Sequence, residues 1–221
     1  MKIAVWNMCN KADQSAAADK IREFFEDGCD AVALQEVPYE HSEASKPLSA
    51  TLSTDMGLDH TFIHTRGLPY RGPERIAGYG TAILSTSSLA SATHSTPRSD
   101  RWAYMTAGKG NQRAAVAFSH PSCPDVRIVI GHLSYRLVGK IGAAGLRDER
   151  VKLAQFLEAQ SAAGRIIFAG DTNCRPGTGL DRIFSRAGLN PVAPSELTIN
   201  HPTYRSRYPG LGSIQEPLDR V

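Results

Sequence analysis

Polar residues follow several short apolar segments of this sequence, at points where a buried strand would end. The set comprises Asn7, Glu36, His132, Asp171 and Asn173. Taken singly, each of them is explained by a turn, a helix cap or a surface charge. In open α/β sheets, however, ligands bind in the crevice outside the carboxyl ends of the strands. We therefore expect the five side chains to meet in one cleft.

The residue types in this set suit the hydrolysis of a phosphoester with a divalent cation. Glu36 and Asn7 offer the hard oxygen ligands that Mg²⁺ or Mn²⁺ prefers. Asp171 carries a carboxylate that could orient or deprotonate a water molecule. Asn173 and His132 could donate hydrogen bonds to the oxygens that gain charge at phosphorus. The set predicts metal-assisted hydrolysis.

The segment Arg165–Pro176 (RIIFAGDTNCRP) is expected to position the carboxylate. Its apolar run 166–169 is too short for an independent helix, and Gly170 follows at once. This pattern predicts a buried strand that ends in a tight turn. Asp171 and Asn173 are two residues apart, so in an extended chain they point to the same side.

Other strand-like segments are expected to carry the remaining members of the set. Residues 2–6 lead to Asn7, residues 30–38 contain Glu36 near their end, and residues 126–133 contain His132. Pro38 is not expected to continue the second of these as a central strand, since proline has no N–H group to donate. Further strands are predicted over residues 62–64, 81–85, 102–106 and 113–118.

Helical patterns alternate with these strands. The clearest covers residues 15–27, where Ile21, Phe24 and Phe25 follow the spacing of one helix face and Gly28 follows as a stop. Other helices are predicted over residues 42–56, 146–160 and 180–187. This alternation indicates an α/β or α+β fold rather than a helix bundle.

The Gly- and Pro-rich segment 66–80 is predicted to be a loop, and it carries Arg71 between two other arginines. It could be a phosphate-facing rim or a solvated connection. Further basic residues stand at Arg136, Lys140, Arg205 and Arg207.

Composition limits the remaining possibilities. The 221 residues, 41% of them hydrophobic, are enough for one sizeable domain, which we place over residues 1–221. A net charge of +3 permits an anionic substrate without requiring nucleic acid. The four cysteines show no CxxC pair, which favours a reduced, cytoplasmic protein. No apolar run is long enough to cross a membrane, and nothing indicates a protein partner.

Six short motifs, in this order, resemble the endonuclease/exonuclease/phosphatase superfamily, which has the deoxyribonuclease I-like fold. They are Trp6-Asn7, Leu34–Val37, Gly78–Ser85, Gly131–Leu133, Gly170–Asn173 and Leu218–Val221. The resemblance implies a four-layer sandwich of two mixed β-sheets flanked by helices. It implies that Glu36 binds the cation, that Asn7 supports cation or phosphate, and that Asp171 positions the attacking water. It implies that His132 and Asn173 contact the phosphate.

The resemblance also supplies candidates for substrate binding. The segment around Tyr204 is similar to a threonine–aromatic segment of the superfamily, and Tyr79 lies within a matched motif. With Arg71 and Arg136, these residues are the candidates for substrate binding. The substrate is expected to be a phosphoester, and DNA, RNA, a phospholipid and a small phosphoester all stay open.

The sequence departs from the superfamily pattern after Asp219. There the matching aspartate opens a strand and orients a histidine that follows some tens of residues later, whereas this sequence ends at Val221. We therefore expect the domain to lack its last strand or strands and to be incomplete at the C-terminus. Three hypotheses follow: a phosphodiesterase, nuclease or phosphatase; a catalytically weak or inactive phosphate-ligand-binding domain; or an unfolded remnant.

Overall fold

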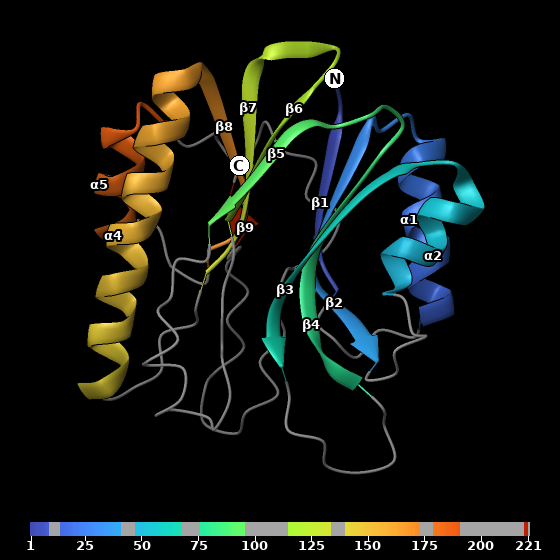
Figure 1. The fold of residues 1–221 in the computed structure, drawn as a ribbon, viewed down its shortest axis with the longest axis horizontal. Coiled ribbons are helices and arrows are strands. Elements are labelled where there is room, and N and C mark those ends of the chain that lie inside the picture. Colours follow the sequence, from blue (N-terminus) through green and yellow to red (C-terminus); the bar gives the residue numbers. More distant parts are fainter. Residues whose placement is uncertain are drawn as a thin grey trace.

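The computed structural model describes residues 1–8, 14–40, 47–67, 76–95, 115–133, 140–172, 179–190 and 219–220. In these ranges the chain forms two mixed β-sheets that face each other, with helices on their outer sides (Figure 1). This arrangement confirms the four-layer α/β sandwich that the sequence predicts.

The N-terminal half of the chain builds the first sheet and the helices that cover it. Its elements are β1 (Ile3–Asn7), α1 (Gln14–Glu26), β2 (Ala31–Glu40), α2 (Leu48–Met56), β3 (Asp59–Gly67) and β4 (Ile76–Ser85). The strand order is β1-β2-β4-β3. Strands β1 and β2 are parallel and are joined through α1, because parallel neighbours need a crossover connection. Strand β4 is antiparallel to both of its neighbours.

The C-terminal half builds the second sheet in a similar way. Its elements are β5 (Ala90–Ser95), β6 (Ala115–His120), β7 (Cys123–His132), α4 (Lys140–Ala163), β8 (Arg165–Asp171), α5 (Gly179–Arg186) and β9 (Asp219–Arg220). The strands follow one another in chain order across the sheet. Strands β7 and β8 are parallel, with α4 between them in the chain, and the other pairs are antiparallel. Each sheet thus contains one parallel pair.

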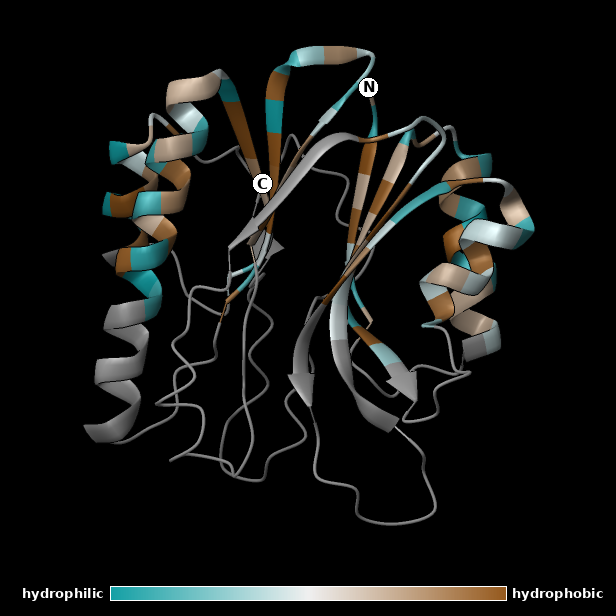
Figure 2. Ribbon diagram, in the orientation of Figure 1, coloured by the Kyte–Doolittle hydropathy of each residue, from teal (hydrophilic) through white to brown (hydrophobic). Residues whose placement is uncertain are grey.

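Hydrophobic side chains fill the three spaces between the layers. One cluster, with Ile21 and Leu52, packs α1 and α2 against the first sheet. A second, with Leu157 and Phe184, packs α4 and α5 against the second sheet. A third, around Phe118, joins the two sheets. The strands are accordingly largely hydrophobic, whereas the helices carry hydrophilic residues as well (Figure 2). None of the helices in the described ranges is long and apolar enough to cross a bilayer.

Pro38 does not end β2, but β2 does not continue through it as a central strand. Strand β2 continues to Glu40, and Pro38 pairs with Tyr79 of β4. The reason is that the pairing of β2 with β1 ends where Asn7 lies opposite Gln35. Beyond this point β2 has a strand on one side only within the described ranges, and an edge position tolerates a residue without an N–H group.

Most other predicted elements are present, with different limits. Strands β3 and β4 extend into the predicted loop 66–80, and α4 begins at Lys140 rather than near residue 146. Strand β5 was not predicted, because its six residues include no large apolar side chain. The predicted strand 102–106 lies outside the described residues.

Candidate active site

The structure brings together four of the five polar residues that the sequence singles out. Asn7 ends β1, His132 ends β7 and Asp171 ends β8, while Glu36 lies within β2. Strands β1 and β8 belong to different sheets but are in contact. The first sheet therefore supplies two of these side chains, and the second sheet supplies the other two.

The four side chains are close neighbours. The Asn7 amide nitrogen Nδ2 donates a hydrogen bond of 2.9 Å to Asp171 Oδ2. The His132 ring nitrogen Nε2 lies 3.6 Å from Glu36 Oε1 and 3.9 Å from Asp171 Oδ2. One imidazole thus lies beside both carboxylates.

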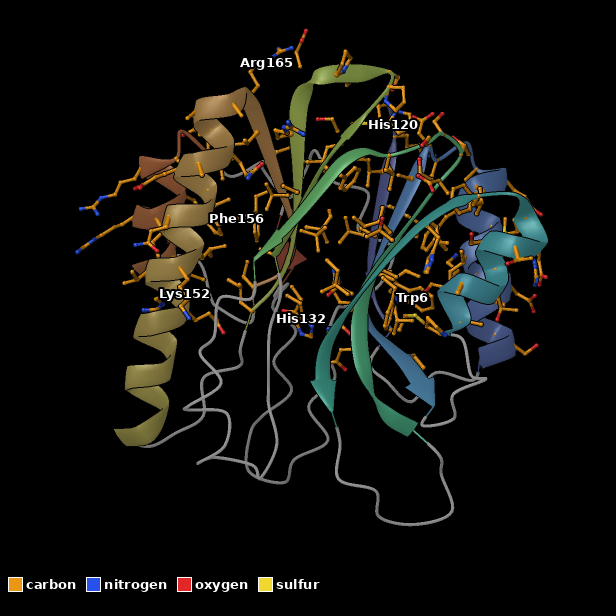
Figure 3. The ribbon with its side chains drawn as sticks, viewed as in Figure 1. Trp6, His120, His132, Lys152, Phe156 and Arg165 are labelled. Atoms are coloured by element: carbon orange, nitrogen blue, oxygen red, sulfur yellow. The ribbon has the colours of Figure 1, made fainter. Side chains whose placement is uncertain are left out.

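Strand periodicity explains why these side chains meet. Ile130, two residues before His132, belongs to the hydrophobic cluster between the sheets, and so does Ala169, two residues before Asp171. Val5 packs against the same cluster two residues before Asn7. Alternate residues of a strand share a face, so each polar residue continues an apolar row that lies between the sheets. Figure 3 shows His132 between the sheets, whereas Trp6 lies on the side of α1 and α2.

Glu36 reaches this space because β2 is irregular. Leu34 pairs with Ala82 of β4 and Val37 pairs with Gly80, so two residues of β2 lie opposite Thr81 alone. This is a β-bulge, a feature that changes the direction of a side chain. Glu36 has a φ of 54°, in the left-handed region that non-glycine residues rarely adopt. Such strain is common at functional sites.

Two glycines fix the end of β8. Gly170 has a φ of 139°, and a Cβ added there would lie 2.0 Å from the carbonyl oxygen of Gly131. A side chain at Gly131 would in turn lie 2.6 Å from Phe168 Cζ. Close approach at this point allows His132 and Asp171 to be directly paired in the parallel ladder. The Leu133 N–H extends the ladder by donating to the Asp171 carbonyl oxygen at 2.9 Å.

The donor atoms fit a hard divalent cation. The His132 side chain is 1% exposed, Asp171 11% and Glu36 18%, so two carboxylates lie close together with little solvent. A cation would offset their repulsion, and carboxylate and amide oxygens are the ligands that Mg²⁺ prefers. No group of three or more His, Cys, Asp or Glu in the described ranges forms a preformed metal site. Mg²⁺ does not need one, because it usually keeps several waters and takes one or two carboxylates.

The remaining predicted site residues fall into two groups. Asp219 opens β9 and is paired with Asp171 in the antiparallel ladder, and Tyr79 lies in β4 opposite Pro38. The others, Asn173, Arg71, Arg136 and Tyr204, lie outside the described residues.

Sequence reasoning missed two buried polar residues beside the site, Gln35 and Thr81. Gln35 is 0% exposed and Thr81 is 1% exposed. Both stand two residues from an apolar member of the cluster between the sheets, Ala33 or Ile83. The spacing of two residues from a core position was the available signal that these side chains lie between the sheets. It becomes informative only once the bulge in β2 is known.

Comparison with known proteins identifies the family. The model of the Endonuclease/Exonuclease/phosphatase family matches residues 4–213. A comparison with curated proteins gives no significant match.

Solved structures resemble the fold at low sequence identity. The human Nocturnin catalytic domain has a TM-score of 0.63 at 18% identity, over 99% of this chain and 79% of that chain. The 3'-5' exonuclease NExo from Neisseria meningitidis has a TM-score of 0.55 at 18% identity, over 80% of this chain. The match spans only 59% of the Neisseria chain. A family protein from Leptotrichia buccalis C-1013-b has a TM-score of 0.59 at 13% identity, over 84% and 72% of the two chains.

Proposed function

The chain belongs to the Endonuclease/Exonuclease/phosphatase family, and on that basis we propose that it is a divalent-metal-dependent phosphoester hydrolase. In this proposal Glu36 holds Mg²⁺ or Mn²⁺, and Asp171 positions the attacking water. We place the activity in one domain over residues 1–221 of a cytoplasmic protein. The free thiols of Cys29 and Cys123 are in keeping with a reducing compartment.

One observation carries the proposal: His132 Nε2 lies 3.6 Å from Glu36 Oε1 and 3.9 Å from Asp171 Oδ2. A carboxylate from each sheet therefore reaches the same point. Two carboxylates that face one point and are shielded from water repel each other, and a cation bound between them would offset this cost. A hydrolytic site uses both of them, one for the cation and one for the water.

Each residue of the candidate site has its own role in the proposed hydrolysis. Asn7 donates to Asp171 Oδ2 and so holds the carboxylate in one orientation, in which it can accept a proton from water. His132 and Asn173 donate hydrogen bonds to the phosphoryl oxygens, and Asn7 supports cation or phosphate from the side of the first sheet. A bound Mg²⁺ would polarise a phosphoryl oxygen as a Lewis acid. Asp219, paired with Asp171 across the ladder, completes the proposed catalytic set.

For the substrate, a nucleic acid is our first candidate. A structure of Neisseria NExo, described as a 3' phosphatase, contains a product DNA hairpin, and the human Nocturnin domain contains a sulfate anion. Arg71, Tyr79, Arg136 and Tyr204 are the proposed substrate contacts. Affinity for a single-stranded oligonucleotide should then fall as salt rises, whereas affinity that ignores salt would exclude this class.

The test is hydrolysis of a generic phosphodiester, bis(p-nitrophenyl) phosphate, with Mg²⁺ and with EDTA. We expect Asp171→Ala to lower kcat about 10²–10⁴-fold, since that is the usual contribution of a positioned acid or base. Asp125→Ala is the matched control, because Asp125 is an exposed carboxylate near the opposite end of β7. Equal rates for the wild type and Asp171→Ala would refute the hydrolase proposal. Metal-dependent binding of phosphate without turnover would support a catalytically inactive binding domain instead.

A further inference from the structure

The bulge in β2 places three polar residues on one face of the first sheet. Leu34 and Val37 both belong to the cluster on the helix side of the sheet, although they are three residues apart. Regular alternation would put them on opposite faces. The extra residue therefore leaves Gln35 and Glu36 together on the other face, between the sheets. Thr81 lies opposite them in β4, two residues before Ile83 of the cluster between the sheets.

Gln35 and Thr81 have buried polar atoms that their neighbours do not satisfy. Within the described part of the chain, Gln35 Nε2, Gln35 Oε1 and Thr81 Oγ1 have no hydrogen-bond partner. Leaving a buried donor or acceptor unpaired destabilises the folded protein, because the group loses its hydration and gains no partner. Native proteins rarely keep such groups, and those that remain commonly bind a water or an ion or serve the chemistry of a site. Here all three atoms belong to residues that adjoin the strained Glu36 in sequence or in the ladder.

We propose that Gln35 and Thr81 are positioning residues, whose amide and hydroxyl groups donate hydrogen bonds to the Glu36 carboxylate when a divalent cation binds there. The inference rests on the proposed function, because it assigns the cation to Glu36. Carboxylates that ligate metals are commonly held by such neighbouring donors, and losing one costs about 10–100-fold in metal affinity or activity.

The proposal and a purely structural role predict different effects on the stability of the metal-free protein and on its affinity for the cation. If the polar atoms are unpaired until the cation binds, apolar replacements of similar shape should leave the metal-free protein equally or more stable. The same replacements should weaken the binding of the cation. A purely structural role predicts loss of stability instead.

The experiment uses Gln35→Met and Thr81→Val, which keep the side-chain size. Leu34→Met is the matched control, because Leu34 adjoins Gln35 but packs on the helix side of the sheet. Mn²⁺ affinity is measured by titration calorimetry, and stability is measured as the thermal midpoint in EDTA. We expect both test variants to keep or raise the midpoint and to bind Mn²⁺ about 10–100-fold more weakly. The control should bind Mn²⁺ like the wild type.

A double-mutant cycle shows whether Gln35 acts through Glu36. In a Glu36→Gln background, Gln35→Met should cause little further loss of Mn²⁺ affinity, since residues that act as one unit are not additive. Additive losses, unchanged Mn²⁺ affinity in both single variants, or a lowered midpoint in EDTA would each overturn the inference. If Glu36→Gln itself left Mn²⁺ binding and hydrolysis unchanged, the proposed function would fail as well.

Discussion

At the scale of single residues, the contact between Asn7 and Asp171 is the most informative, because it joins the two sheets at the site. Both atoms of this hydrogen bond belong to residues that end strands, 2.9 Å apart. Its acceptor is a carboxylate, and hydrogen bonds to charged groups contribute about 1.5–3 kcal/mol. The bond is therefore strong enough to fix the orientation of the proposed base.

We predict that Asn7→Ala lowers kcat/KM about 10–100-fold, which corresponds to the loss of one charge-assisted hydrogen bond. Asn7→Asp should lower it further, because a second carboxylate would repel Asp171 at the same distance. Steady-state kinetics on the phosphodiester measure both effects. Asn190→Ala, at an exposed asparagine, controls for the substitution itself. An unaffected Asn7→Ala enzyme would show that this hydrogen bond has no part in turnover.

A second residue-scale prediction concerns His60, which lies away from the site. Its Nε2 is 3.0 Å from Ser49 Oγ, and burial lowers the pKa of the imidazole, although Asp59 acts in the opposite direction. The unfolded chain therefore takes up the proton at higher pH than the folded chain. The contribution of His60 to stability is complete above about pH 6.5 and is lost as pH falls below it.

Thermal midpoints measured between about pH 7.5 and pH 5 should show this loss in the wild type. In His60→Gln, which cannot titrate, the fall over this interval should be smaller. The same pH dependence in both proteins would show that other groups cause it.

At the scale of elements, the end of β8 depends on Gly170. Any other residue must adopt a φ of 139° and bring its Cβ against the Gly131 carbonyl oxygen. We expect Gly170→Ala to lower the free energy of unfolding by about 3 kcal/mol or more, because overpacking adds to backbone strain. Gly188→Ala is the control, since Gly188 has a φ of 75° but open space for a Cβ. It should cost only about 1–2 kcal/mol.

Urea denaturation of the two variants separates the free-energy cost of overpacking from the cost of the backbone conformation. If both variants lost the same amount, the close approach of β7 and β8 would not contribute. The β8 end would then tolerate a side chain, and the register of His132 with Asp171 would need another explanation.

The sequence was sufficient for most of the described elements, but not for β5 or for the irregularities of the strands. Apolar runs before Asn7, His132 and Asp171 predicted the strands, and the positions of these residues at strand ends predicted that they would lie in one cleft. The bulge at Glu36 could not be predicted, because its register depends on β4, some forty residues later in the chain. Pro38 lies beyond the pairing of β2 with β1, in keeping with the prediction, whereas the extension of β2 to Glu40 depends on its pairing with β4.

At the scale of the whole molecule, the two halves of the chain form separate sheets that share one core. The cluster around Phe118 contains residues from both sheets. We therefore predict that the chain unfolds in one cooperative transition, as expected of a single domain. Urea curves followed by tryptophan fluorescence and by far-ultraviolet circular dichroism should coincide. Two separate transitions would show that the halves fold independently.

Each sheet supplies two of the four side chains of the candidate site, so the catalytic rate would depend on how the two sheets are aligned. A slight slide of one sheet along the other would part Glu36 from Asp171 while each sheet kept its own ladder intact. Substitutions deep in the shared core, such as Phe118→Leu, would then slow the reaction well below the melting temperature. The catalytic rate would thus report the alignment of the two sheets, even when the substituted residue lies in the core and does not contact the substrate.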